Sequence, residues 1–228
     1  MNDKKLDLGS WVNDVVQHLL DNYSGAFDSI GQVVSGFSEA IENLLMLPPA
    51  WLLIAIFVAL GLWRIGARFA VFTAVAFILI VMTGFWEQTV VTLGLTFSST
   101  LISLLLGIPL GIWAAKSERV ATIIRPILDF MQTMPAFVYL IPAAMLFGLG
   151  RVPGIIATVI FAMPPAVRLT SLGIRQVNKE IVEAGQSFGC TSRQLLFKVQ
   201  LPNAMPSIMA GVNQTIMMAL SMVIIASM

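Results

Sequence analysis

The chain has 228 residues, of which 57% are hydrophobic and 11% are charged, and its mean hydropathy is +0.88. Because a soluble globular domain carries about 25% charged residues, this composition indicates an all-α, polytopic membrane protein. The net charge of +1 leaves no basic face for a nucleic-acid partner. The single cysteine, Cys190, excludes an intrachain disulfide, and the single histidine, His18, stands apart from any cluster that would hold a metal.

Residues 1–43 are predicted to form an extracytoplasmic, amphipathic helical region. Lys4 and Lys5 are not followed by the compact apolar core of a secretory signal. Apolar residues then recur at helical spacing twice, which predicts two amphipathic helices. The first pattern comprises Leu8, Trp11, Val12, Val15, Val16, Leu19 and Leu20, and the second Phe27, Ile30, Val33, Val34, Phe37 and Ile41. These helices would lie on the outer membrane surface or against the helix bundle, and a solvent-exposed hairpin is the alternative.

Residues 44–228 are predicted to form a transmembrane domain of about six spans, because a bilayer-crossing helix needs about 20 mostly apolar residues. The candidate spans are 44–63, 69–86, 89–115, 127–149, 152–168 and 204–228. Pro135 and Pro142 fall in the fourth, and Pro164 and Pro165 interrupt the fifth, so we expect both to be inner helices beside a passage. The chain stops inside its last apolar run, which we interpret as the end of a fragment.

The distribution of positive charge predicts an N-terminus outside the cell. With that orientation ten of the thirteen Lys and Arg residues lie on the cytoplasmic side, as the positive-inside rule requires. They are Arg64, Arg68, Lys116, Arg119, Arg125, Arg168, Arg175, Lys179, Arg193 and Lys198. The polar segment 178–202 is then cytoplasmic, and the protein is multi-pass in the cell membrane.

Segment 178–202 has the local signals of two short helices joined at a glycine. Asn178 can cap the first helix, and Gly189 can end it in the left-handed conformation. Thr191 and Gln194 fit a capping box for the second, which Pro202 would stop before opening the last span. Such an elbow suits the transmission of force, whereas an ordinary cytoplasmic loop of amphipathic helices is the alternative.

This segment also carries a specific pattern: Glu183-Ala184-Gly185, three residues, Gly189, nine residues, then Val199, Leu201 and Pro202. It closely resembles the EAA loop of ABC importer membrane subunits, E-A-A-x3-G-x9-I-x-L-P, with Gly185 in place of the second alanine and Val199 in place of isoleucine. The resemblance implies the type I ABC importer transmembrane fold. It also implies that these residues dock on a cytoplasmic ABC ATPase subunit.

Further segments resemble the permease subunits of glycine betaine and proline betaine importers. They are residues 124–129, 131–140, 161–165, 197–202 and 211–215. The resemblance implies a homodimer of permeases, two ATPase subunits that bind ATP and Mg, and an extracytoplasmic substrate-binding protein or fused domain. It implies uptake of quaternary ammonium osmolytes for osmoprotection. Choline, carnitine or an amino acid as the substrate, and a secondary transporter or channel without an ATPase, stay open as alternatives.

The chain itself is not expected to be an enzyme or to hold a cofactor. It has no G-x-x-x-x-G-K-[ST] phosphate loop, so ATP hydrolysis would fall to a separate subunit.

Some residues are candidates for a translocation path, because aromatic faces attract quaternary cations and polar groups at membrane depth turn inward. They are Gln132, Thr133, Pro135, Phe137, Tyr139, Asn213 and Gln214. Packing of the aromatic rings in the bundle, and hydrogen bonds from the polar side chains to neighbouring helices, are the alternatives. Arg125 and Asp129 are spaced for an i,i+4 ion pair rather than a proton relay.

Overall fold

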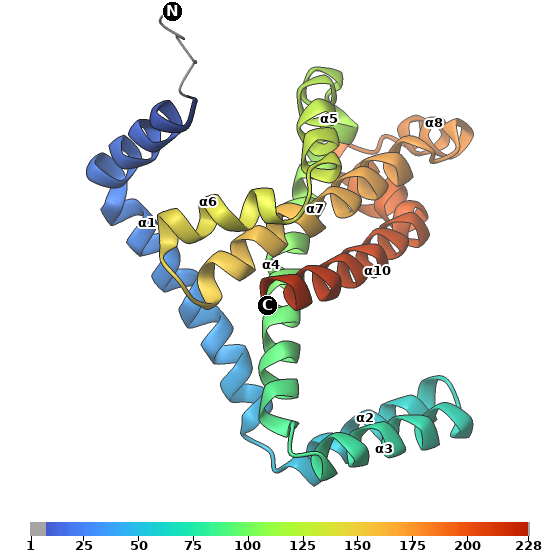
Figure 1. Cartoon of the computed structure of the whole chain (residues 1–228). Coiled ribbons are helices and arrows are strands. Elements are labelled where there is room, and N and C mark those ends of the chain that lie inside the picture. The colour runs from blue at the N-terminus through green and yellow to red at the C-terminus, as the bar shows by residue number, and fades with distance from the viewer. Residues whose placement is uncertain (1–7, 228) are drawn as a thin grey trace, which may run out of the picture.

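The computed structural model describes residues 8–227, in which every regular element is a helix (Figure 1). Side chains are described for residue 14 and from residue 16 onward. Most of the first amphipathic pattern, including Leu8, Trp11, Val12 and Val15, therefore lies outside the described side chains, as do Lys4 and Lys5.

The N-terminal region is α1 (Leu8–Met46), in which two helical segments join at a kink at Tyr23, between the two predicted apolar patterns. Its second half packs against α4, α6 and α7, and the Phe27 ring meets the Phe147 ring edge-on at 5.5 Å between centroids. Ser38 and Glu42 are buried by this packing. Phe27, Val34, Phe37 and Ile41 of the apolar pattern are half-buried, whereas Ile30 and Val33 are exposed, so the pattern faces the bundle only in part.

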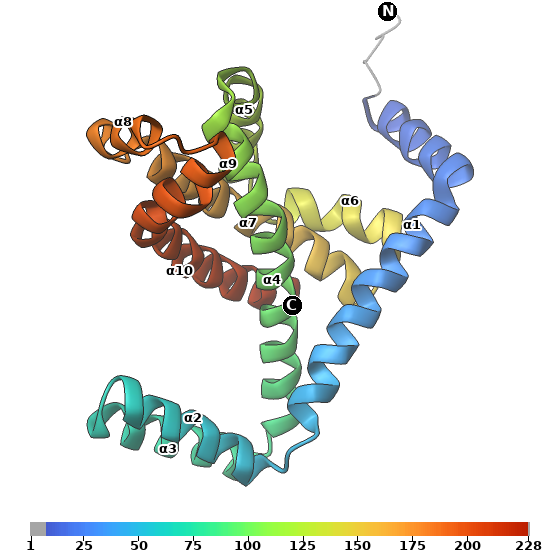
Figure 2. The ribbon, with the colours of Figure 1, turned by 180° about the vertical axis from the view of Figure 1, so that it is seen from behind.

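Helices α2 (Ala50–Arg64) and α3 (Ala67–Met82) form an apolar hairpin that projects away from the other helices (Figures 1 and 2). Gly66, at φ +127°, makes the turn, and the rings of Phe57 and Phe77 stack at 5.5 Å. A bend of 91° separates α1 from α2, so the predicted span 44–63 begins at Ala50. At 1.5 Å per residue each helix rises only about 22–24 Å, less than the ~30 Å hydrocarbon core.

Within residues 8–227, three helical stretches are long and apolar enough to cross a membrane, and up to five if each bent helix pair counts as one span. They are α4 (Trp86–Lys116), α7 (Arg151–Arg175) and Ser192–Ala226, which includes α10 (Leu201–Ala226). Helix α7 runs unbroken through Pro164 and Pro165, which corrects the predicted interruption. Both prolines are buried among neighbouring helices, the setting in which a membrane helix tolerates a lost backbone donor.

The predicted span 127–149 is not one helix. Helix α5 (Glu118–Thr133) and α6 (Phe137–Phe147) meet at an angle of 98°. Pro135 is the physical cause, because it disfavours helical geometry at the preceding residue, and Met134 is extended at φ −79° and ψ 141°. Pro142 lies within α6 without ending it.

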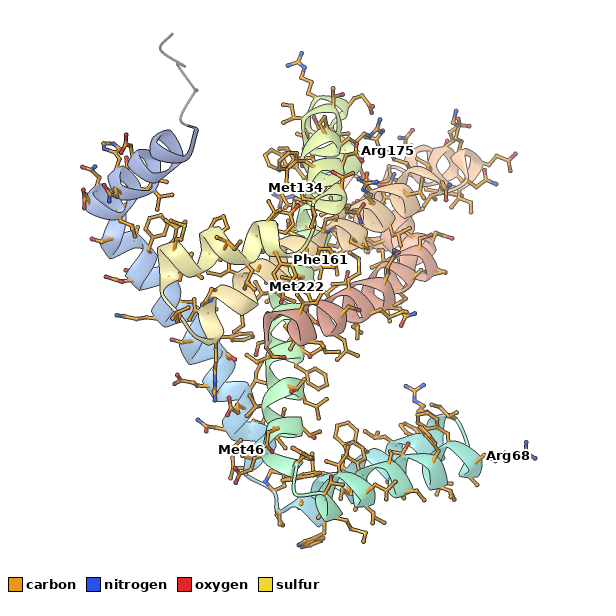
Figure 3. The ribbon with its side chains drawn as sticks, in the orientation of Figure 1. Met46, Arg68, Met134, Phe161, Arg175 and Met222 are labelled. Carbon is orange, nitrogen blue, oxygen red and sulfur yellow. The ribbon has the colours of Figure 1, made fainter. Side chains whose placement is uncertain are left out.

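The tightest packing joins α4, α7 and α10 through small residues. A Cβ atom on Gly111 of α4 would lie 2.7 Å from the Thr170 Cβ of α7, and one on Gly173 of α7 would lie 2.7 Å from the Ser207 Cβ of α10. Helix α7 is therefore held between two neighbours at close backbone approach. Figure 3 shows Phe161 and Met222 in this region, with Arg175 where α7 ends.

Candidate functional site

Helix α8 (Lys179–Ser187) begins and ends as the sequence predicts. The Asn178 side-chain oxygen accepts a hydrogen bond from the Glu180 N–H at 3.0 Å, which caps the helix. Gly189 adopts φ +78°, and the N–H of Cys190 reaches back to the Gly185 carbonyl at 3.1 Å. A left-handed glycine with this backward bond is a common way to end a helix. The first half of the elbow is therefore a rigid, capped unit.

The second half departs from the prediction. Thr191 and Gln194 form the expected capping box at α9 (Ser192–Gln194). The chain does not stop at Pro202, however, because the π-helical turn η1 (Leu195–Gln200) carries it directly into α10. Pro202 lacks an N–H, and the π turn adapts the backbone hydrogen bonds just before it. The Asn203 side-chain amide donates a hydrogen bond to the Val199 carbonyl oxygen, near the end of this turn, at 2.7 Å.

The inner face of α8 packs on η1. A Cβ atom on Gly185 would lie 2.9 Å from the Leu195 Cδ1 and 3.5 Å from the Val199 Cγ2. The glycine at this position therefore allows close contact between the two halves of the elbow. The departure from the EAA pattern at Gly185 is thus part of the packing, and Val199 belongs to the same contact.

The outer face of α8 is an exposed apolar stripe, which we call the α8 stripe: Ile181, Ala184 and Phe188. These residues are spaced i, i+3 and i+7, so they share one side of the helix, and Phe188 is 89% exposed. Glu183 is also exposed, on a different side of the helix. Figures 1 and 2 show α8 projecting from the end of the bundle. Sequence reasoning missed Ile181 and Phe188, although the amphipathic spacing of α8 was the signal for them.

The other predicted residues of the loop are spread between surface and interior. Ala184, Gly189 and Pro202 are exposed, whereas Leu201 is half-buried at the start of α10. A cleft of about 310 Å³ separates α8 from the end of α4 and is lined in part by Glu183, Gln186 and Arg175. The structure therefore brings Glu183 toward the C-terminal ends of α4 and α7.

The predicted pair between Arg125 and Asp129 does not form, and each side chain has another partner. Asp129 contacts Arg168 of α7, not Arg125, and Arg125 lies 3.7 Å from Glu118. The reason lies in the tertiary structure, because α5 packs with Asp129 toward α7. Arg168 lies within α7, whereas the sequence placed it at the end of a span beside a loop. A hydrogen bond from Arg175 holds the pKa of the Glu118 carboxyl below its usual range.

The candidate path residues fall in two places. Five of them, Gln132, Thr133, Pro135, Phe137 and Tyr139, lie at the bend between α5 and α6. Asn213 and Gln214 are exposed on α10, whereas the adjacent Gly211 and Thr215 are buried. Helix α10 packs on α7, α4 and η1, so within this single chain the two groups are not joined into one site.

Residues 107–228 match the family described as "Binding-protein-dependent transport system inner membrane component". The chain belongs to this family. The matched range contains the bend between α5 and α6, the whole elbow and α10. The fold is accordingly the transmembrane fold of type I ABC importers, and the chain is a multi-pass membrane component of a transport system.

Several named transport proteins are similar to this chain over almost its whole length. It is 50% identical to the glycine betaine/proline betaine permease ProW of Escherichia coli, covering 98% of this chain and 63% of ProW. It is 50% identical to the glycine betaine/carnitine permease GbuB of Listeria monocytogenes, covering 100% of this chain and 82% of GbuB. The glycine betaine permease OpuAB of Bacillus subtilis is 47% identical, with coverage of 98% and 79%.

Proposed function

We propose that the chain is the permease subunit of an ATP-driven ABC importer that moves glycine betaine or proline betaine into the cell. The similarity to ProW, GbuB and OpuAB supports this substrate class, since their names share glycine betaine. The chain spans about two thirds of ProW and about four fifths of the other two, so the activity of the complete protein is part of the proposal.

The observation that carries the proposal is the α8 stripe on a rigid, capped helix. An apolar aromatic residue that is 89% exposed outside the long membrane helices calls for a protein partner. The partner would be an ATPase subunit that binds ATP and Mg, and the chain itself would hold no cofactor. Closure of the ATPases would push α8, and the elbow 178–202 would pass that motion to α7 and α10.

The placement of charge supports an N-terminus outside. The tip of the α2–α3 hairpin, labelled at Arg68, and the end of the bundle that carries α8 both lie on the right of the view, the hairpin tip far below α8 (Figures 1 and 3). Both ends then face the cytoplasm, in agreement with the positive-inside rule. An extracytoplasmic binding protein or fused domain would deliver the substrate to the opposite side.

A second copy of the chain would complete the passage. Asn213 and Gln214 are exposed in the middle of a mostly apolar helix, and polar groups at membrane depth rarely face lipid. In a homodimer this face of α10 would meet the other permease or line the passage, and the bend at Pro135 would lie beside it. Neither group of path residues forms a complete site in one chain.

Uptake of labelled glycine betaine into proteoliposomes tests the proposal. The vesicles would contain the complete permease with its ATPase and binding protein, with and without ATP on the ATPase side. Uptake that requires both ATP and the binding protein is the expected result. Uptake indifferent to ATP would instead favour a secondary transporter and overturn the role of segment 178–202.

The substrate has a specific runner-up. Relatives named as carnitine and choline permeases are 31% and 35% identical over shorter parts of the chain. Competition between labelled glycine betaine and unlabelled proline betaine, choline, carnitine or an amino acid would separate these substrates. Stronger competition by choline or carnitine than by proline betaine would move the assignment to that alternative.

A further inference from the structure

Arg175 occupies the point where three helices meet. It is the last residue of α7 and lies just before Asn178, the cap of α8. Its Nη1 donates to the Glu118 Oε2 at 2.5 Å, and its Nη2 donates to the Ala114 carbonyl oxygen at 2.6 Å. One guanidinium group therefore contacts the end of α4 and the start of α5 simultaneously. We call this junction, from Ala114 to Glu118, the α4–α5 corner.

Both acceptors are suited to a cation. Ala114 lies in the last turn of α4, where carbonyl groups have no partner within the helix and carry the negative end of its dipole. Glu118 is the first residue of α5 after its cap, Ser117. The planar fork of arginine can serve a carbonyl and a carboxylate together, whereas lysine presents a single point of charge.

Two routes lead from α8 to the end of α4. The first is apolar: α8 packs on η1, and Leu196 of η1 lies in a buried cluster against which Ile112 and Ala115 of α4 pack. The inner face of α8 packs on η1 through Gly185 and Leu195, and a cleft of about 310 Å³ separates α8 from Ala115 of α4. Arg175 lines this cleft and also lines the adjacent groove between α5 and α7. The second route is polar and runs through the C-terminal end of α7, where Arg175 contacts both Ala114 of α4 and Glu118 of α5.

Beyond the corner, α5 is held to α7 along its length. Asp129 pairs with Arg168, which lies about two turns before Arg175 on the same face of α7. Leu128 and Met131 pack against Val167 in a buried cluster between the two helices. Because α5 leads directly into the bend at Pro135, a movement of the corner is carried to the α5–α6 bend.

We infer that Arg175 is a positioning residue that couples displacement of α8 to the α4–α5 corner, and through α5 to the bend that would border the passage. The inference rests on the proposed function, because it requires α8 to be moved by an ATPase. It assigns Arg175 a role in coupling and not in substrate binding or ATP hydrolysis.

The test compares Arg175→Gln, Arg175→Lys and the control Arg119→Gln in the complete transporter. Arg119 is the neighbour of Glu118, is exposed, and makes no ion pair with any residue from 14 to 227 whose side chain is described. Labelled glycine betaine uptake and ATP hydrolysis would be measured on the same proteoliposomes, and their ratio is the readout. A role limited to stabilising the fold would lower both rates together and leave the ratio unchanged.

We expect Arg175→Gln to lower uptake per ATP about tenfold, the factor that corresponds to one charge-assisted hydrogen bond, with hydrolysis kept. Arg175→Lys should give an intermediate ratio, since it keeps the charge and loses the fork. Arg119→Gln should match the wild type.

A wild-type ratio in Arg175→Gln would overturn the inference while leaving the proposed function intact. If Arg175→Gln does not assemble into a transporter, Arg175→Lys provides the test. A ratio of uptake to ATP hydrolysis in Arg175→Lys equal to that of the wild type would then overturn the inference. Wild-type vesicles without ATP-dependent uptake would overturn the proposed function, and the inference would fall with it.

Discussion

The hydroxyl group of Tyr139 donates a hydrogen bond to the Met131 carbonyl oxygen at 2.9 Å, across the bend between α5 and α6. The Phe130 carbonyl oxygen lies 3.1 Å from the same hydroxyl group. The Phe130 carbonyl also accepts from the Met134 N–H at 3.3 Å. The residue four positions after Met131 is Pro135, which has no N–H to donate, so the tyrosine supplies the donor for the Met131 carbonyl. The polar atom of this candidate path residue is therefore engaged with the backbone, whereas its ring stays available to the passage.

Tyr139→Phe should destabilise the bend. The Met131 carbonyl would lose its donor, which costs about 1–3 kcal/mol where water is scarce, whereas the Phe130 carbonyl would keep the Met134 N–H. Thermal unfolding of the purified protein in detergent would show a lower Tm. Tyr23→Phe is the matched control, because Tyr23 is exposed at the kink of α1, and it should leave the Tm unchanged. An equal effect of both changes would contradict this account of Tyr139.

Phe188→Asp should weaken binding of the ATPase subunit without unfolding the permease. A buried aromatic anchor at an interface contributes about 2 kcal/mol or more, so the affinity should fall about 30-fold. Co-purification and titration of the ATPase subunit would measure the loss. Phe85→Asp is the control, since Phe85 is also an exposed phenylalanine but lies at the turn before α4, which we place outside. Unchanged ATPase binding by Phe188→Asp would remove the α8 stripe from the docking surface.

Gly189→Ala should strain the elbow, and Gly189→Pro should abolish coupled uptake. Gly189 has φ +78°, which costs a residue with a Cβ atom about 1–2 kcal/mol and is closed to proline. Gly189→Asn should be milder than alanine, because asparagine tolerates this conformation. Uptake per ATP in proteoliposomes should therefore fall from Gly189→Asn through Gly189→Ala to Gly189→Pro. Normal uptake by Gly189→Pro would contradict the role of this turn.

Gly185→Leu should separate α8 from η1, because the added side chain meets Leu195 at close range. Overpacking of this kind costs about 1–3 kcal/mol, whereas Gly185→Ala should cost less, since the contacted Leu195 methyl group can move. Adding Leu195→Ala to Gly185→Leu should restore part of the lost uptake per ATP. Failure of this second change to rescue would mean that α8 and η1 are not coupled through these two residues.

Gly111→Val should disrupt the packing of α4 on α7. Its Cβ atom would lie 2.7 Å from both the Thr170 Cβ and the Val167 carbonyl oxygen, and a backbone atom cannot move aside as a flexible side chain can. We expect a loss of about 3 kcal/mol, seen as a lower Tm and reduced yield in the membrane. Gly36→Val on α1, with open space around its Cβ position, is the control. Equal stability of the two variants would refute the close approach.

Local features of the elbow were predictable because their causes are local. Asn178, Gly189 and the pair Thr191 and Gln194 cap or end helices through bonds to residues a few positions away. The same local logic failed at Pro202, since a proline ends a helix only if the preceding turn cannot widen, and here η1 does widen. Whether the seven residues of the EAA-like pattern act in coupling stays a prediction.

The number and course of the membrane helices were only partly predictable. Apolar composition located α4, α7 and α10, because each needs only a long apolar stretch. It did not distinguish Pro135, where the helix bends by 98°, from Pro164 and Pro165, where the helix continues. The difference depends on the neighbouring helices, which surround α7 on more than one side.

The sequence alone determined the all-α membrane class, the apolar stretches and the capped elbow, because composition and near-neighbour bonds set all three. Tertiary structure alone decided that Asp129 pairs with Arg168 and not with Arg125, and that Arg175 contacts Ala114 and Glu118. These contacts join residues far apart in the chain, and they depend on the rotation of each helix about its axis. That rotation follows from the fit of small residues such as Gly111 and Gly173 against neighbouring helices, which no local pattern records.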